Sequence, residues 1–227
     1  MNRQPEVSGL EAAPTGHAAG LPPRLRHVYW VGGGSGAGKS VVARRLASQH
    51  GLHRYPTDDM MADHASRSTP DECPSLTEFA AMDMDERWVN RSPETMLETF
   101  HWFQGEGFGL IVDDLLRLPS SPGVVAEGFR LLPRLVKPLL AVPANAVWLL
   151  PTPEFRQAAF AHRGSLWEIP GKTSDPGRAL RNLLDRDRMF TERLRDEAKR
   201  LDLHIIDVDT TMTEDDLVAR VTAAFRL

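Results

Sequence analysis

Cysteine is almost missing from this sequence, since Cys73 is the only one in 227 residues. A single cysteine cannot form a disulfide within the chain, and this usage fits a reducing cytoplasm. No segment approaches the roughly 18 consecutive apolar residues that a membrane-spanning helix needs. The N-terminus also lacks the basic start and apolar middle of a signal peptide. These absences argue against a disulfide-stabilised secreted domain and against a membrane protein, and we expect a cytoplasmic location.

Excess positive charge and zinc-binding patterns are missing as well. The formal net charge is −4, so the charge balance gives no reason to expect a nucleic acid or an anionic membrane as partner. The eight histidines are scattered, and none stands at a zinc-site spacing from a cysteine or carboxylate. We therefore expect structural or surface roles for them. The length suits one domain, predicted at residues 25–227, after a disordered leader at residues 1–24 that is rich in proline and small residues.

A glycine-rich stretch is the most specific feature of the sequence. It follows the apolar run His27–Val31, precedes the helical pattern Val41–Ala47, and reads Gly33-Gly34-Ser35-Gly36-Ala37-Gly38-Lys39-Ser40. This matches G-x-x-x-x-G-K-[ST] at every fixed position, between a strand and a helix as the motif requires. Such a loop points backbone N–H groups and a helix N-terminus at phosphates. We expect Lys39 to reach the β- and γ-phosphates of a nucleotide, Ser40 to ligate Mg²⁺, and Val41 to continue the binding segment. The alternative is a glycine turn with a chance lysine.

The rest of the chain alternates between short apolar strands and helices, which is typical of an α/β fold with a parallel sheet. Strands are predicted at about 27–32, 52–56, 124–128, 146–150 and 203–209. Helices are predicted from the glycine loop to about residue 50, from residue 92 through 103, and over about 108–118, 133–140, 154–163, 178–201 and 213–225. Residues 60–92 are predicted to be irregular in structure, and residues 164–177 are predicted as a loop with an exposed Trp167.

Acidic residues follow two of the predicted strands. Asp58 and Asp59 end the second strand, where open α/β sheets keep their chemistry. Alternatively, Thr57 or Asp58 only caps the segment that begins at Met60. Glu127 ends the third strand and is our candidate for a residue near Mg²⁺.

Two further positions leave alternatives open. The run Leu110–Asp114 resembles an apolar strand ending in a metal-binding aspartate, but its apolar residues recur at helical spacing through Leu118. Asp113 and Asp114 are then expected on a solvated helix face. Arg91 is a candidate to face a phosphorylated substrate, although such an arginine is more often solvated.

Taken together, this order of motifs resembles the P-loop kinases of small molecules, such as uridine, nucleoside monophosphate and gluconate kinases. Val125-Ala126-Glu127-Gly128 resembles the third strand of the uridine-kinase-like members, and residues 182–187 resemble a lid helix with arginines on the transferring phosphate. The resemblance implies a three-layer α/β/α P-loop NTPase fold with a five-stranded parallel sheet of order 2-3-1-4-5. It also implies an acceptor-side insertion at about 60–118, a lid at about 164–190 and an adenine site near residues 209–211. The residues it adds to the site are Arg178, Arg186, Asp209 and Thr211.

These patterns lead to the hypothesis of an ATP- and Mg²⁺-dependent kinase of a small hydroxylated or phosphorylated metabolite. Lys39 would neutralise the γ-phosphate, Ser40 and Glu127 would hold Mg²⁺, Asp58 or Asp59 would orient the acceptor hydroxyl, and Arg186 would cover the transfer. A nucleoside or nucleotide kinase differs only in its acceptor. An ATP-binding regulatory protein with slow ATPase activity is an alternative of another class. We expect a monomer or homodimer.

Overall fold

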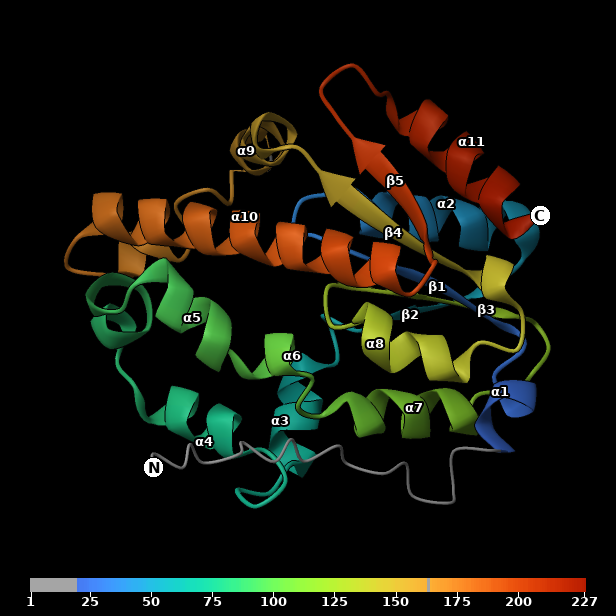
Figure 1. The fold of residues 1–227 in the computed structure, drawn as a ribbon, viewed down its shortest axis with the longest axis horizontal. Helices are drawn as coiled ribbons and strands as arrows, with labels where there is room; N and C mark the ends of the chain where they lie inside the picture. Colours follow the sequence, from blue (N-terminus) through green and yellow to red (C-terminus); the bar gives the residue numbers. More distant parts are fainter. Residues whose placement is uncertain (1–19, 163) are drawn as a thin grey trace, which may run out of the picture.

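Five strands form one all-parallel sheet in the computed structural model, which describes residues 20–162 and 164–227 (Figure 1). The strand order is β2-β3-β1-β4-β5, as the sequence predicts. The strands are β1 (Val28–Gly33), β2 (His53–Pro56), β3 (Val124–Glu127), β4 (Ala146–Pro151) and β5 (His204–Val208). Every residue of β3 and β4 is buried, as expected for central parallel strands that are covered on both faces. The α/β class is thereby confirmed.

Helices cover both faces of the sheet because successive side chains of each strand point to opposite sides. Trp30 and Trp148 belong to one apolar cluster, on the face covered by α7 (Phe108–Arg117), α8 (Pro133–Val136) and α10 (Pro176–Arg200). Val31 and Leu149 belong to the other, under α2 (Lys39–His50) and α11 (Glu214–Phe225). Figure 1 shows α10 crossing the molecule and α2 lying beside α11. Several predicted site residues follow the carboxyl ends of the strands: the glycine loop after β1, Asp58 after β2, and Glu127 at the end of β3.

The segment between β2 and β3 departs from the predicted irregular structure at residues 60–92. It contains α3 (Met61–Arg67), α4 (Pro74–Ala81), a π-helix η2 (Glu86–Asn90), α5 (Pro93–Thr99) and α6 (His101–Gln104). The prediction is wrong because these helices are too short to show a clear period, and they are stabilised by packing on one another and on α10. The single helix expected over 92–103 is divided at Phe100, whose backbone is extended.

Several sequence-based boundaries are confirmed. Gly51 ends α2 in the left-handed conformation, Ser92 caps α5 by accepting from the Thr95 amide, and Thr213 forms a capping box with Asp216 at the start of α11. Residues 108–117 form the helix α7 rather than a strand. The remaining elements are α1 (Leu21–Arg24), η3 (Lys137–Leu139), η4 (Pro143–Asn145), α9 (Pro153–His162) and η5 (Pro170–Lys172).

The predicted leader falls partly on described residues. Residues 1–19 lie outside them. Leu21–Arg24 form α1, and Leu21 packs against the core cluster that contains Leu25, so the prediction of disorder is wrong for this short stretch. Within the described part of the chain, no helix is both long enough and apolar enough to cross a membrane.

Candidate functional site

The glycine-rich loop joins the end of β1 to the first turn of α2. Gly38 adopts the left-handed conformation, with φ at 81°, and precedes the helix as its N-cap. Glycine reaches this region without the steric cost that a side chain brings. Backbone N–H groups at the start of a helix that follows such a loop are the groups that bind phosphates. The buried Lys39 folds back over the loop, where its Nζ donates to the Gly34 carbonyl oxygen at 2.8 Å.

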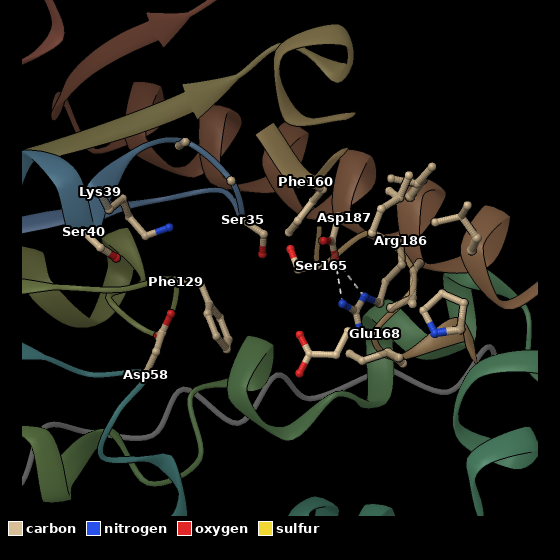
Figure 2. Close-up of a pocket in the computed structure, with 18 of the residues that line it drawn as sticks. Ser35, Lys39, Ser40, Asp58, Phe129, Phe160, Ser165, Glu168, Arg186 and Asp187 are labelled. Carbon is tan, nitrogen blue, oxygen red and sulfur yellow. Dashed lines mark hydrogen bonds and ion pairs between the residues drawn. The ribbon is translucent and has the colours of Figure 1, made fainter. Parts of the chain in front are cut away.

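A cavity of about 470 Å³ opens beside residues Ser35–Ser40 of this loop. Its walls come from segments that lie far apart in the sequence, and they bring together Lys39, Asp58, Phe129, Glu168 and Arg186. Figure 2 shows Lys39, Ser40 and Asp58 on one side of the cavity and Glu168, Arg186 and Asp187 on the other. The catalytic residues predicted from sequence therefore converge here, with the exception of Asp59.

Glu127 lies directly beside Ser40. The Ser40 Oγ donates to Glu127 Oε2 at 3.2 Å, and the Glu127 side chain is buried. Burial raises the pKa of Glu127, and the nearby charge of Asp58 raises it further, while Lys39 opposes both effects. The Ser40 hydroxyl and the Glu127 carboxylate offer two oxygen ligands, and the Asp58 carboxylate lies close by. Mg²⁺ prefers such hard oxygen donors. These residues could therefore hold a magnesium ion.

The two aspartates after β2 face different surroundings. Asp58 lines the cavity, and burial raises its pKa, partly offset by Lys39 and by the Thr57 hydroxyl, which donates to it at 3.3 Å. The Asp59 side chain is 65% exposed and approaches only Arg54, at 3.9 Å. Neither Thr57 nor Asp58 caps α3, because its N-cap is Met60 and no side chain bonds there. The capping alternative is therefore wrong, and Asp58 is the better candidate of the pair.

A buried polar network that the sequence did not reveal holds the end of β2. Arg130 donates through Nη1 to the Thr57 carbonyl oxygen at 3.3 Å and to His64 Nδ1 at 2.9 Å. Because a guanidinium can only donate, Nδ1 accepts and Nε2 carries the proton directed at Asp114 Oδ2, 2.8 Å away. The Tyr55 hydroxyl donates to the same oxygen at 2.9 Å. The chain of bonds connects α7 and α3 to the backbone next to Asp58.

This network corrects one prediction, the solvated position of Asp114, and it gives His64 a structural role. Asp114 is not on a solvated face, since its side chain is only 15% exposed, although its neighbour Asp113 is exposed as expected. His64 is fully buried and paired with a carboxylate 50 residues away, a separation that no local spacing rule can detect. Burial lowers the pKa of His64 and lowers that of Arg130 to about 10. Asp63, His64 and Asp114 come within 4.8 Å of one another, but Arg67 already donates to both carboxylates, so they form an ion-pair cluster.

Two buried arginines lie near the site: Arg186 lines the cavity, whereas Arg156 lies beside Gly36 of the loop and does not line it. Arg186 donates through Nε and Nη2 to Asp187 Oδ1, at 3.0 and 2.7 Å, and its guanidinium lies within 5.1 Å of three aromatic ring centroids. Within the part of the chain that the structure describes, Arg186 Nη1 has no hydrogen-bond partner, and neither has Nε of Arg156. Arg156 packs against the loop, because a Cβ added at Gly36 would lie 3.1 Å from its Cγ. Sequence reasoning missed Arg156, since nothing in α9 distinguishes it from a surface arginine.

Arg178, the other predicted lid arginine, is exposed and lines neither cavity described here. The predicted lid segment itself packs on the insertion. The Ser174 amide donates to Asp85 Oδ1 at 2.7 Å, and Asn182 Nδ2 donates to the Trp88 carbonyl oxygen at 3.1 Å.

A second cavity, of about 340 Å³, lies on the other side of the loop. It is bounded by Gly36, Gly38 and Val41, by α9 at Phe155, and by the segment after β5 at Thr210 and Met212. The predicted contacts Asp209 and Thr211 do not line it. Asp209 Oδ1 instead accepts from the amide and hydroxyl of Thr211, at 2.8 and 2.6 Å. The two cavities meet at Gly36 and Gly38, so an extended ligand could occupy both across the loop. Comparison of the chain with models of known protein families and with curated proteins found no match.

Proposed function

We propose that this chain is an ATP- and Mg²⁺-dependent kinase with a P-loop NTPase fold, which transfers the γ-phosphate to a hydroxyl group of a small molecule. The observation that carries the proposal is the convergence of Lys39, Asp58 and Arg186 on one cavity beside the glycine-rich loop. Hydrolysis alone needs no enclosed space for a second substrate. Phosphoryl transfer needs chiefly positioning and charge neutralisation, and these are what such residues supply.

The nucleotide would lie across the loop, with its base in the second cavity and its phosphates against the loop amides. Lys39 carries the ammonium that pairs with the β- and γ-phosphates once it turns from the Gly34 carbonyl oxygen. Val41, Phe155 and Met212 give the second cavity an apolar lining suited to an aromatic base.

Ser40 and Glu127 are the residues that would hold Mg²⁺. An ion held by these two residues would supply positive charge that neutralises the phosphates of the nucleotide. The raised pKa values of Glu127 and Asp58 support this, because two buried carboxylates that face each other favour a nearby cation.

Asp58 would accept a hydrogen bond from the acceptor hydroxyl and take its proton. The hydroxyl oxygen forms a bond to the γ-phosphorus, the bond from that phosphorus to the β-bridging oxygen breaks, and ADP leaves. A pKa raised by burial makes Asp58 a stronger base than an exposed aspartate. Arg186 lines the cavity and Arg156 packs on the glycine loop, and we propose that their planar guanidinium groups turn toward the oxygens of the transferring phosphoryl group.

The experiment measures ADP release with Mg²⁺ and ATP against a panel of hydroxylated metabolites, using full-length protein. We expect acceptor-dependent release that falls at least roughly a hundredfold in Lys39→Ala, the usual cost of removing one preorganised electrostatic contact. Asp58→Asn should lower turnover by about two to four orders of magnitude with little change in ATP affinity.

Asp59→Asn is the matched control, since the neighbouring carboxylate faces solvent, and it should behave as the unmodified chain. If no acceptor raises ADP release and Asp58→Asn hydrolyses ATP as well as the unmodified chain does, the chain is instead a nucleotide-binding regulator with slow ATPase activity.

A further inference from the structure

The acceptor side of the first cavity has an apolar wall. Its members are Met61 at the start of α3, Phe129 after β3, Ile169 before η5, and Leu180 and Leu183 on α10. Figure 2 shows the Phe129 ring between the Asp58 side of the cavity and the Glu168 side. A ligand that fills this space therefore gains by presenting a ring or an alkyl chain to Phe129.

Apart from Arg186, which donates to Asp187, the charged groups on this side of the cavity are acidic. Asp58 lies at the loop end of the wall and Glu168 at the opposite end, and the Glu168 carboxylate is directed into the cavity in Figure 2. Among the described residues, Lys39 and Arg186 are the cations that line the cavity, and both lie where the proposed function needs charge for the phosphates of ATP. No described cation is left over for an anionic acceptor.

The insertion supplies no cation either. Between β2 and β3 the sequence has no lysine and four arginines, and none of the four lines the cavity. Arg67 and Arg117 donate to Asp114. Arg87 donates to the carbonyl oxygens of Phe79 and Ala80.

Arg91, the one arginine that the sequence suggested for a phosphorylated substrate, is also occupied elsewhere. It donates to Met82 Sδ and to the Thr99 hydroxyl. After β3, Arg130 is buried over the Trp102 ring and is bonded to Thr57 and His64. Among the described residues, the acceptor side of the cavity therefore has no free arginine that could bind a phosphorylated substrate through two parallel hydrogen bonds.

We propose that the acceptor is an alcohol without phosphate or carboxylate, built on an apolar ring or chain and carrying an amine that faces Glu168. This inference rests on the proposed kinase function and narrows its substrate class. The hydroxyl meets Asp58, the apolar body packs on Phe129, and the ammonium pairs with Glu168. A phosphorylated metabolite would instead place its phosphate between the carboxylates of Asp58 and Glu168. Repulsion between these negative charges would weaken its binding.

The test compares kcat/KM for matched acceptors with Mg²⁺ and ATP. The probes are a phenyl-substituted amino alcohol, its N-acetyl derivative, its carboxylate counterpart, and a nucleoside with its 5′-monophosphate. We expect the amino alcohol to be preferred over the N-acetyl compound by about two- to fivefold, the range of a partly exposed ion pair. The two anionic compounds should be at least about a hundredfold poorer than the N-acetyl compound and the nucleoside, because of like-charge repulsion.

Glu168→Gln should abolish the preference for the amine over the N-acetyl compound. Glu154→Gln on α9 is the control, because Glu154 is exposed and lines neither cavity. If phosphate is transferred to the monophosphate or the carboxylate compound in preference to the others, the inference is wrong while the kinase proposal stands. If ADP release stays at its acceptor-free rate with every probe and with the whole metabolite panel, the kinase proposal fails and the inference with it.

Discussion

Replacing Gly128 with alanine is expected to damage both the fold and the candidate site, because this residue lies where β3 passes the end of β2. A Cβ added there would lie 1.8 Å from the Thr57 hydroxyl oxygen and 2.9 Å from Asp58 Oδ1. The backbone φ of 152° is also unfavourable for a residue with a side chain. The methyl group can fit only if Thr57 and Asp58 move, and Arg130 holds the Thr57 carbonyl oxygen in place.

The magnitude follows from two costs. Overpacking a close contact costs about 1–3 kcal/mol, and an unfavourable backbone conformation costs about 1–3 kcal/mol. We expect the free energy of unfolding to fall by about 2–6 kcal/mol, which lowers Tm by roughly 4–24 °C in a domain of this size. Acceptor-dependent turnover should fall by about a hundredfold or more, since a displacement of Asp58 by about 1 Å misaligns the acceptor.

Calorimetry and the ADP-release assay measure the two effects. Gly109→Ala is the matched control, because Gly109 lies within α7 and a Cβ there would meet no atom within 4 Å. That substitution should raise stability by about 0.4–1 kcal/mol and leave turnover unchanged. If Gly128→Ala has the stability and turnover of the unmodified chain, the close approach of Gly128 to Thr57 and Asp58 does not exist in solution.

Two further predictions concern carboxylates. Asp114→Asn should lower the free energy of unfolding by about 1–3 kcal/mol, because it weakens the hydrogen bonds to His64, Tyr55 and Arg67. Asp113 is exposed, so Asp113→Asn should change this free energy by no more than about 0.5 kcal/mol. Equal denaturation midpoints for the two variants would refute the buried network. Burial raises the pKa of Glu127, so its contribution to stability is greatest below the ordinary carboxyl pKa and is lost as pH rises through the raised value. Without Mg²⁺, Glu127→Gln should therefore raise Tm near neutral pH, and the gain should shrink toward about pH 4. A gain that grows with acidity would contradict the burial argument.

The sequence predicted those features that depend on neighbours along the chain. The α/β class agrees with the alternation of strands and helices, and residues 108–117 are helical as their apolar spacing indicates, whereas the strand order was implied only by the family resemblance. The helices between residues 61 and 90 were missed because their stability comes from contacts with distant segments. Trp88, for example, packs in a cluster with Met96 and Ala179.

The candidate site likewise contains residues that the sequence predicts and residues that it does not. Lys39, Ser40 and Glu127 follow from the motif and from the convergence of strand ends, and the last two are hydrogen-bonded in the structure. The sequence could not decide between Asp58 and Asp59, because the two residues are adjacent and both are aspartates. Only the structure shows that Asp58 lines the cavity and that Asp59 faces solvent. Arg156 was missed because its neighbour Gly36 lies 120 residues earlier in the chain.

The fate of the γ-phosphate tests the kinase proposal most directly. The protein is incubated with Mg²⁺ and ATP labelled at the γ-phosphate, together with the best acceptor from the panel, and the label is followed into products. We predict that the label appears on the acceptor in the same amount as ADP, and that Lys39→Ala forms neither product above background. Recovery of all the label as inorganic phosphate, at a rate that no acceptor changes, would contradict the proposal.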